Sequence, residues 1–489
     1  MRSQDDDITR RDALRQLSSF ALLCSIGGVT AASRRPRAVT SAALRAQDRA
    51  PFRPFRAELP RIPELRPTRR TRDRDVYDLT IRRGTAEILR GYETPILGYD
   101  GHYPGPTIRA RRGREVVVRQ RNALNVDVNV HLHGGTVPAA HDGHPMDLIA
   151  PGTTKTYRYP NRQAAATLWY HDHAHGRTAR SVHRGLAGFY LLEDRFEVEL
   201  ELPRGAFDVP LMIQDRAFNR DGSLRYASSP EPGFLGDTIL VNGAVAPRMR
   251  VRRRRYRLRL LNASNAREYR LVLGGGRPML QIASDGGLLE RPLKRRAITL
   301  APAERVDVVV DFRDYPPGTE LVLHNELGRR STVAVMRFDV ERGGGAEEAL
   351  VPRRLRELGA LPAPAVDRRF ELSLSTAGGI AWQIGGRSFD MDRIDVRPRL
   401  GTSERWTFAN TSARVHPMHT HGFLFRVLAR SSGPVPRSER GWKDTVPVRP
   451  GESVTVQPWF SPYPGRYVFH CHALEHGDFG MMLQMEVER

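Results

Sequence analysis

Short runs rich in β-branched residues recur along the chain, and glycine and proline separate them. Runs of this length bounded by turn residues are typical of β-strands. No long stretch repeats apolar residues at the spacing of an α-helix. The pattern therefore predicts an all-β protein made of sandwiches or barrels. Representative runs are Glu115–Gln120, Tyr256–Leu261, Val306–Phe312 and Val454–Phe460.

The length of 489 residues predicts about three domains, because a domain usually takes roughly 150 residues. Three consecutive glycines, followed by several prolines, interrupt the strand-like runs and indicate a linker. We expect a first domain over residues 51–195, a second over 196–345, the linker over 346–366 and a third domain over 367–489.

The N-terminal 50 residues have the features of an export leader. Thr9-Arg10-Arg11-Asp12-Ala13-Leu14 precedes an apolar stretch, Leu17–Ala32, and together they resemble a twin-arginine signal. That route moves folded proteins, so we expect a periplasmic or extracellular protein exported in folded form. A disordered, arginine-rich tail is the alternative. No other segment is long and apolar enough to span a membrane.

The chain carries a formal net charge of +22, and a strongly basic protein can bind nucleic acid. Only three of the 77 basic residues are lysines, and the arginines are spread along the whole chain. The densest basic run, Arg252–Arg255, enters an expected strand and has no interleaved aromatic residues. We attribute the charge to a general preference for arginine and expect no nucleic-acid partner.

Most of the 16 histidines fall in four short clusters, and each cluster contains a His-x-His pair. Residues i and i+2 of a strand point to the same face, so each pair aims two imidazoles at one place. Eight imidazoles exceed what one first-row metal ion needs and suit a metal cluster. The pairs are His131 and His133, His171 and His173, His419 and His421, and His470 and His472.

Cys471 lies between His470 and His472, so it faces the opposite side of the same strand. One strand would then serve two metal sites. Further ligands for the cysteine site are His416 before it, and His476 and Met481 after it. Two histidines, one cysteine and a weak axial methionine form the ligand set of an electron-transfer copper, and soft thiolate disfavours calcium or magnesium.

The remaining histidines, His102, His141, His144, His175, His183 and His324, have no such pattern, and we interpret them as surface, core or supporting residues. Cys24 lies in the expected leader. Removal of the leader would leave Cys471 as the single cysteine, so no intrachain disulfide could form.

The four clusters resemble, in order, the four copper-binding motifs of the multicopper oxidases. The resemblance covers nearly all of the chain after the leader and is strongest to the branch of bacterial spore-coat laccases and bilirubin oxidases. It implies three consecutive cupredoxin-like domains, each a Greek-key β-barrel. Further matching segments are Gly101-His-Tyr-Pro-Gly-Pro-Thr, Leu240-Val-Asn-Gly, Leu261-Asn-Ala-Ser-Asn, Ser284-Asp-Gly-Gly-Leu, Ala301-Pro-Ala-Glu-Arg and Gly441-Trp-Lys-Asp-Thr.

The same resemblance implies four copper ions with defined ligands. One type 1 copper would be held by His416, Cys471 and His476, with Met481 as axial ligand. One type 2 copper would be held by His131 and His419. A type 3 pair would be held by His133, His171, His173, His421, His470 and His472.

Two positions bear on proton transfer. Asp142 follows His131 by eleven residues and matches an acid that the family keeps near its three-copper cluster. The branch often has a glutamate directly after the histidine that His476 matches, but this chain has Gly477. Asp478, Glu475 or water could take the place of that glutamate.

The resemblance implies a laccase-like oxidase that takes single electrons from phenolic, aromatic-amine or bilirubin-type donors and reduces O2 to two waters. The donor would dock at the ring edge of His476. A metal oxidase acting on Cu(I), Fe(II) or Mn(II) is the second possibility, although the methionines are scattered, apart from Met481, Met482 and Met485. A copper-binding electron-transfer protein is the third. We expect a monomer, since one chain supplies every ligand.

Overall fold

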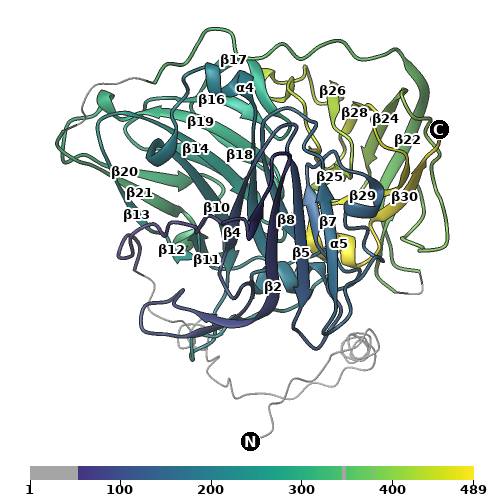
Figure 1. Ribbon diagram of the computed structural model, residues 1–489, viewed down its shortest axis with the longest axis horizontal. Coiled ribbons are helices and arrows are strands. Elements are labelled where there is room, and N and C mark those ends of the chain that lie inside the picture. Colours follow the sequence, from purple (N-terminus) through teal and green to yellow (C-terminus); the bar gives the residue numbers. More distant parts are fainter. Residues whose placement is uncertain (1–52, 344–348, 378) are drawn as a thin grey trace, which may run out of the picture.

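The computed structural model of this chain describes residues 53–343, 349–377 and 379–489, and the expected export leader, residues 1–50, lies outside them. The described chain is built mainly of β-strands with a few short helices, which confirms the all-β prediction. Six sheets form three successive pairs (Figure 1). None of the helices in the described part reaches the length and apolar character required to cross a bilayer.

The first pair of sheets comes from the N-terminal third. Its elements are β1 (Arg69–Arg70), β2 (Arg74–Ala86), β3 (Thr94–Tyr99), β4 (Gly105–Arg111), β5 (Glu115–Asn122), β6 (His131–His133), η1 (Ala139–His141), β7 (Thr154–Tyr159), β8 (Ala166–His171), α3 (Thr178–Arg184), β9 (Ala187–Glu193) and α4 (Arg195–Glu199). One sheet holds β1, β2, β3, β5 and β7, and the other has the order β4-β9-β8-β6. In β2, Tyr77, Leu79 and Ile81 are buried while Asp78 and Thr80 face outward, the alternation expected of a strand with one face on a core.

The second pair follows. Its elements are η2 (Gly205–Phe207), β10 (Asp208–Arg216), β11 (Thr238–Val241), β12 (Ala244–Val245), β13 (Arg248–Val251), β14 (Arg255–Asn262), β15 (Tyr269–Leu273), β16 (Met279–Ser284), β17 (Gly287–Arg295), β18 (Ile298–Leu300), β19 (Arg305–Asp311), η3 (Phe312–Asp314), β20 (Glu320–Asn325), η4 (Arg330–Thr332) and β21 (Ala334–Val340). The sheets have the orders β12-β11-β10-β14-β19-β16-β17 and β13-β21-β20-β15-β18.

The third pair contains the last two histidine clusters. Its elements are β22 (Pro364–Ser375), β23 (Ala381–Ile384), β24 (Ser403–Asn410), β25 (His416–Thr420), β26 (Phe425–Arg430), η5 (Arg437–Glu439), β27 (Thr445–Val448), β28 (Ser453–Pro458), β29 (Gly465–Cys471), α5 (Leu474–Asp478) and β30 (Met482–Val487). The sheets have the orders β23-β22-β24-β28-β26 and β27-β25-β29-β30.

One pairing pattern repeats in the three units. In each unit, one long strand pairs antiparallel with its hairpin partner. The same strand pairs parallel with another long strand, and these parallel pairs are β2 with β5, β10 with β14, and β22 with β24. Each unit has its own apolar core between its two sheets. The parallel pairs require the chain to cross between sheets, as Greek-key connections do.

Buried charges join the units. On β14, Leu258 and Leu260 alternate with Arg257 and Arg259, so both guanidinium groups lie on the face that packs against the first unit. Arg257 pairs with Glu197 of the first unit at 2.7 Å, and Arg259 Nη1 donates to the Thr167 hydroxyl on β8 at 3.0 Å. Buried arginines are stable only when paired, so these contacts fix how the first two units meet.

The first and third units also lie against each other, since α3 contacts α5 and η1 contacts β29. The Tyr467 hydroxyl donates to the backbone carbonyl of Val137 at 2.9 Å. The backbone N–H groups of Thr178 and Ala179, at the start of α3, donate to the carboxylate of Asp478 on α5. This contact surface is where the histidine clusters meet.

Candidate metal centres

Two pairs of facing strands place the histidine pairs opposite each other. In the first unit β6 runs antiparallel to β8, and His131 is the register partner of His171. In the third unit β25 runs antiparallel to β29, and His419 is the register partner of His470. The two strand pairs face each other across the contact between the units, so all four pairs of imidazoles point into one space.

The eight imidazoles converge at ligand distances from one another. His173 Nε2 and His421 Nε2 lie 3.0 and 3.1 Å from His470 Nε2, and His419 Nε2 lies 3.4 Å from His131 Nε2. All eight rings are buried. They form three groups whose nitrogen atoms lie close enough to hold a metal ion, namely His131 with His133 and His419, His133 with His171 and His472, and His173 with His421 and His470.

These rings are held neutral by their surroundings. Burial lowers the pKa of His171 and of His470 to about 3, and burial holds the pKa of His131 and of His472 well below the ordinary value. A neutral imidazole keeps a free lone pair on one nitrogen, which is the form that binds metal.

Several ring nitrogens have no partner among the described residues, although buried polar atoms are normally hydrogen-bonded. They are Nδ1 of His133, Nε2 of His171, Nδ1 of His173 and both ring nitrogens of His472. Buried lone pairs that converge without donors fit metal ions that bind imidazole. The donor set therefore fits copper ions in this space.

Backbone carbonyls orient the rings. His131 Nδ1 donates to the carbonyl of Asp142 at 2.6 Å, and His419 Nδ1 donates to that of Asp444 at 2.8 Å. His171 Nδ1 and His470 Nδ1 each donate to the carbonyl of the next residue in the chain. These residues are Asp172 and Cys471, and both distances are 2.9 Å. Such bonds fix the tautomer and aim the other nitrogen at the metal space.

A second group lies on the opposite side of β29. Cys471 Sγ lies 3.4 Å from His416 Nδ1 and 3.5 Å from His476 Nδ1, and the two imidazole nitrogens are 3.1 Å apart. Met481 is buried beside them, and its backbone N–H donates to the His476 carbonyl. Burial raises the pKa of the Cys471 thiol, so a bound cation is required for the thiolate form.

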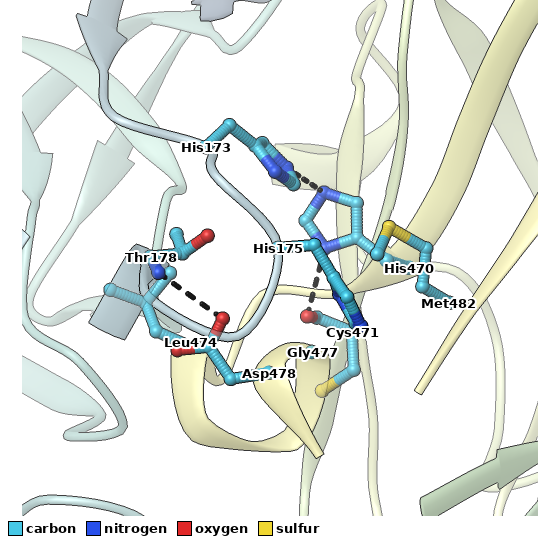
Figure 2. A pocket seen from close by; sticks show the side chains of 9 residues that line it. All are labelled: His173, His175, Thr178, His470, Cys471, Leu474, Gly477, Asp478 and Met482. Atoms are coloured by element: carbon cyan, nitrogen blue, oxygen red, sulfur yellow. Dashed lines mark hydrogen bonds between the residues drawn. The ribbon is translucent and has the colours of Figure 1, made fainter. Parts of the chain in front are cut away.

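Figure 2 shows how one strand serves both groups. The His470 ring points toward His173, while the Cys471 sulfur points away from it. The alternation predicted for His470, Cys471 and His472 is therefore present, and only the backbone of β29 separates the two groups. None of the six other histidines belongs to a potential ligand group in the described chain.

Asp142 lies inside the eight-histidine cluster. Its Oδ2 accepts a hydrogen bond from His421 Nδ1 at 2.7 Å, and Oδ1 has no partner among the described residues. Burial raises the pKa of this carboxyl well above its ordinary value.

The two acids beside Gly477 point in different directions. Asp478 lines a small cavity together with His173, His470 and Gly477 (Figure 2). A Cβ placed on Gly477 would lie 3.9 Å from His470 Nδ1. Glu475 instead turns toward the second unit, where its carboxylate accepts hydrogen bonds from Tyr226 and Asn265.

Sequence reasoning did not identify Asp444 as a site residue. Its Oδ1 lies 3.0 Å from His133 Nε2, and Arg305 from the second unit pairs with the same carboxylate. Burial alone would raise the pKa of Asp444, but the charges and hydrogen bonds of Arg305 and His133 together outweigh this effect and hold the pKa well below its ordinary value. The signal in the sequence was the segment Gly441-Trp-Lys-Asp-Thr, which carried no metal ligand.

Sequence reasoning also did not identify Trp382, and it expected an accessible His476. The Trp382 ring packs on both imidazoles of the cysteine group, and His476 is only 1% exposed. Nothing in the residues around Trp382 indicated this contact, since β23 is separated from both histidines by more than 30 residues.

An all-β chain with a buried eight-imidazole cluster, joined through one strand to a His-Cys-His group, defines a copper-dependent oxidase. Multicopper oxidase domain families match residues 80–197, 196–331 and 362–489. The chain belongs to the multicopper oxidase family, so its three units are cupredoxin-like and it is an oxidase that uses copper and O2.

Individual relatives are similar over most of their length. The chain is 38% identical to a laccase from Bacillus stratosphericus, with 88% of this chain and 99% of the relative aligned. It is 37% identical to a bilirubin oxidase from Albifimbria verrucaria, over 83% of this chain and 75% of the relative. The crystal structure of a laccase from Pediococcus acidilactici superposes with a TM-score of 0.83 at 34% identity, over 90% of this chain and 96% of the laccase.

Removal of copper is expected to destabilise the protein, because the unpartnered imidazole nitrogens would remain buried. Free copper at a hundred times its Kd would stabilise the folded state by about 2.7 kcal/mol relative to the metal-free state. Thermal unfolding of the copper-loaded and chelator-treated protein measures the difference. Copper added back should restore the Tm, whereas magnesium should not, and equal Tm values with and without copper would contradict the assignment.

Proposed function

We propose that this protein is a laccase-like oxidase that takes single electrons from phenolic, aromatic-amine or bilirubin-type donors and reduces O2 to two waters. The observation that carries the proposal is the position of Cys471, the last residue of β29, between His470 and His472 of the eight-histidine cluster. A site that accepts single electrons and a site that can collect several are then joined by one strand. The names of the laccase and bilirubin oxidase relatives support the donor class.

The ligand assignment is part of this proposal. The type 1 copper is assigned to His416, Cys471, His476 and Met481. The type 2 copper is assigned to His131 and His419. The type 3 pair is assigned to His133, His171, His173, His421, His470 and His472. The grouping of the same side chains in the structure supports the assignment for every residue except Met481, which is supported by its burial beside the group.

When bound, the copper ions supply one-electron transfer and the four-electron reduction of O2. The protein supplies the geometry for that chemistry. Cys471 joins the two groups covalently through the peptide bonds to its neighbours, and the carbonyls of Asp142 and Asp444 hold two of the cluster rings in place. Burial of the cluster excludes bulk water from the place where O2 reacts, which limits the loss of partly reduced oxygen.

Asp142 is assigned a role in proton transfer at the cluster, because its buried carboxylate contacts His421 and keeps one oxygen without a partner. Asp478 rather than Glu475 lies toward the cluster, since it lines the cavity next to His470.

One chain supplies all the residues of both groups, which is compatible with a monomer. Export by the twin-arginine route stays a prediction from the N-terminal sequence.

Four copper ions per chain are expected, and the Cys471→Ser protein is expected to hold three and to lose its blue colour. Serine provides no thiolate, whereas the eight histidines of the cluster remain. Metal analysis and the visible absorption spectrum measure the two effects, with circular dichroism as the control for folding. A blue Cys471→Ser protein, or a wild-type protein with one copper per chain, would refute the ligand assignment.

The Asp142→Asn protein is expected to reduce O2 more slowly by roughly tenfold to a hundredfold, because an amide cannot exchange the proton that a positioned acid transfers. Reduction of the blue copper by the donor should stay unchanged. Rapid mixing of the reduced protein with O2 measures the step. Asp147→Asn, an exposed change in the same loop, is the control. Equal reoxidation rates in Asp142→Asn and wild type would exclude the role.

O2 uptake tests the donor class directly. We expect the copper-loaded protein to consume O2 with 2,6-dimethoxyphenol and with bilirubin, without accumulation of peroxide. Cu(I), Fe(II) and Mn(II) are supplied separately at the same concentration. Uptake that is faster with a metal ion than with either aromatic donor would replace the laccase-like function by metal oxidation, and no uptake with any donor would leave only copper binding.

A further inference from the structure

The ligands assigned to the type 1 copper cannot be reached from solvent. His416 and Cys471 are fully buried and His476 is 1% exposed. A donor molecule in solution therefore cannot touch any of the three side chains. Electrons must cross a layer of protein between the donor and this group.

Trp382 forms part of that layer. Its ring centroid lies 4.3 Å from that of His476 and 4.8 Å from that of His416, so one indole packs on both imidazoles. Trp382 is 1% exposed and is held on β23 by a backbone hydrogen bond to the Phe479 carbonyl. Close packing around this large rigid ring holds the Trp382 side chain in one orientation.

The indole N–H connects this ring to the outside. It donates to the backbone carbonyl of Pro230 at 2.7 Å. Pro230, Glu231 and Pro232, called here the proline segment, are half-buried and belong to the second unit. A hydrogen bond therefore joins the proline segment directly to the Trp382 ring, which packs on the proposed copper ligands His416 and His476.

Other contacts fix the proline segment on the third unit. Glu231 accepts a hydrogen bond from Arg414 Nε at 2.8 Å. Tyr226, a few residues upstream, donates to Glu475 on α5. The segment is thus a fixed cover over the cysteine group.

We propose that donor electrons enter through the proline segment and Trp382, and not at an exposed edge of His476. Electronic coupling falls steeply with distance and is stronger through bonds than across a gap. The path runs from the Pro230 carbonyl through its hydrogen bond with the indole N–H, and then through the packing contact between the indole and the two imidazoles. The inference rests on the proposed function and deepens it by naming the place where the donor binds.

Each transfer moves one electron, and Trp382 is a positioning residue that ends the step unchanged. A phenolic donor loses one electron and releases its hydroxyl proton to water. A copper ion held by His416, Cys471 and His476 would supply the acceptor for this electron. The carboxylate of Glu231 is already paired with Arg414, so the segment offers no free acid to a metal ion. Its prolines and the neighbouring Leu235, which is 49% exposed, provide an apolar surface that suits an aromatic donor.

Trp382→Phe tests the path, because phenylalanine keeps a ring but removes the N–H. The blue copper is reduced anaerobically by 2,6-dimethoxyphenol in rapid mixing, and its reduction potential is measured so that rates are compared at equal driving force. We expect reduction to slow by about tenfold or more, while reoxidation by O2 is unchanged. Trp406→Phe is the matched control, since Trp406 is buried in the same core but contacts neither His416 nor His476.

Equal reduction rates in Trp382→Phe and wild type, at equal driving force, would overturn the proposed path. A wild-type protein whose blue copper is not reduced by any aromatic donor would instead overturn the proposed function. The two failures are therefore distinguishable.

Glu231→Gln tests where the donor binds and does not depend on a core substitution. It leaves Arg414 unpaired at the segment, so the KM for ferulate, an anionic phenol, should fall by roughly threefold, as expected for an exposed charge contact. The readout is the ratio of the KM for ferulate to the KM for neutral 2,6-dimethoxyphenol, which the change of charge should lower by the same factor. Glu199→Gln, an exposed change on α4, is the control. Equal KM values for ferulate in Glu231→Gln and wild type would place the donor elsewhere.

Discussion

Eight imidazoles packed nitrogen to nitrogen in one buried space are the constraint on which the rest of this structure depends. Burial removes water from the rings and lowers the pKa of His171 and of His470 to about 3, and several ring nitrogens converge without a hydrogen-bond donor. Metal ions are the partners that satisfy such an arrangement. Half of the imidazoles come from the first unit and half from the third, so the metal ions hold together two parts of the chain that lie about 300 residues apart.

The surrounding charges serve this arrangement. Asp444 contacts His133, and Arg305 of the second unit compensates the negative charge of this buried carboxylate. An unpaired carboxylate in this place would be costly, and a paired one orients a ring that must point at metal. No described residue of the second unit belongs to a potential ligand group. It supplies the cation that lets an anion remain beside the cluster.

The middle unit has a comparable role at the cysteine group. Asn265 donates to Glu475 and so fixes α5, which holds His476. The proline segment covers the same group from outside and bonds to the Trp382 indole. A unit nearly free of histidine therefore determines how a donor approaches a site built in another unit. Three units are needed for the chemistry even though two of them hold every proposed ligand.

The residue types and their spacing determined the fold class of this protein and the directions of the side chains in its fourth histidine cluster. The period of two along a strand placed His470 and His472 on one face and Cys471 on the other, and in the structure His470 and His472 group with the cluster while Cys471 groups with His416 and His476. This relation is local, so it can be read without knowing the fold. Short strand-like runs bounded by glycine and proline likewise indicated an all-β chain, because strand formation depends on neighbouring residues.

Only the tertiary structure decided which distant residues complete the sites. Asp444 with Arg305, and Trp382 with Pro230, meet across units, and no periodicity relates their positions in the sequence. The directions of Glu475 and Asp478 depend on which unit packs against each face of α5. The ring that packs on His476 is held by Pro230, which lies more than 200 residues from His476 in the sequence. Spacing along a strand fixes where a side chain points, but packing between units fixes what it meets.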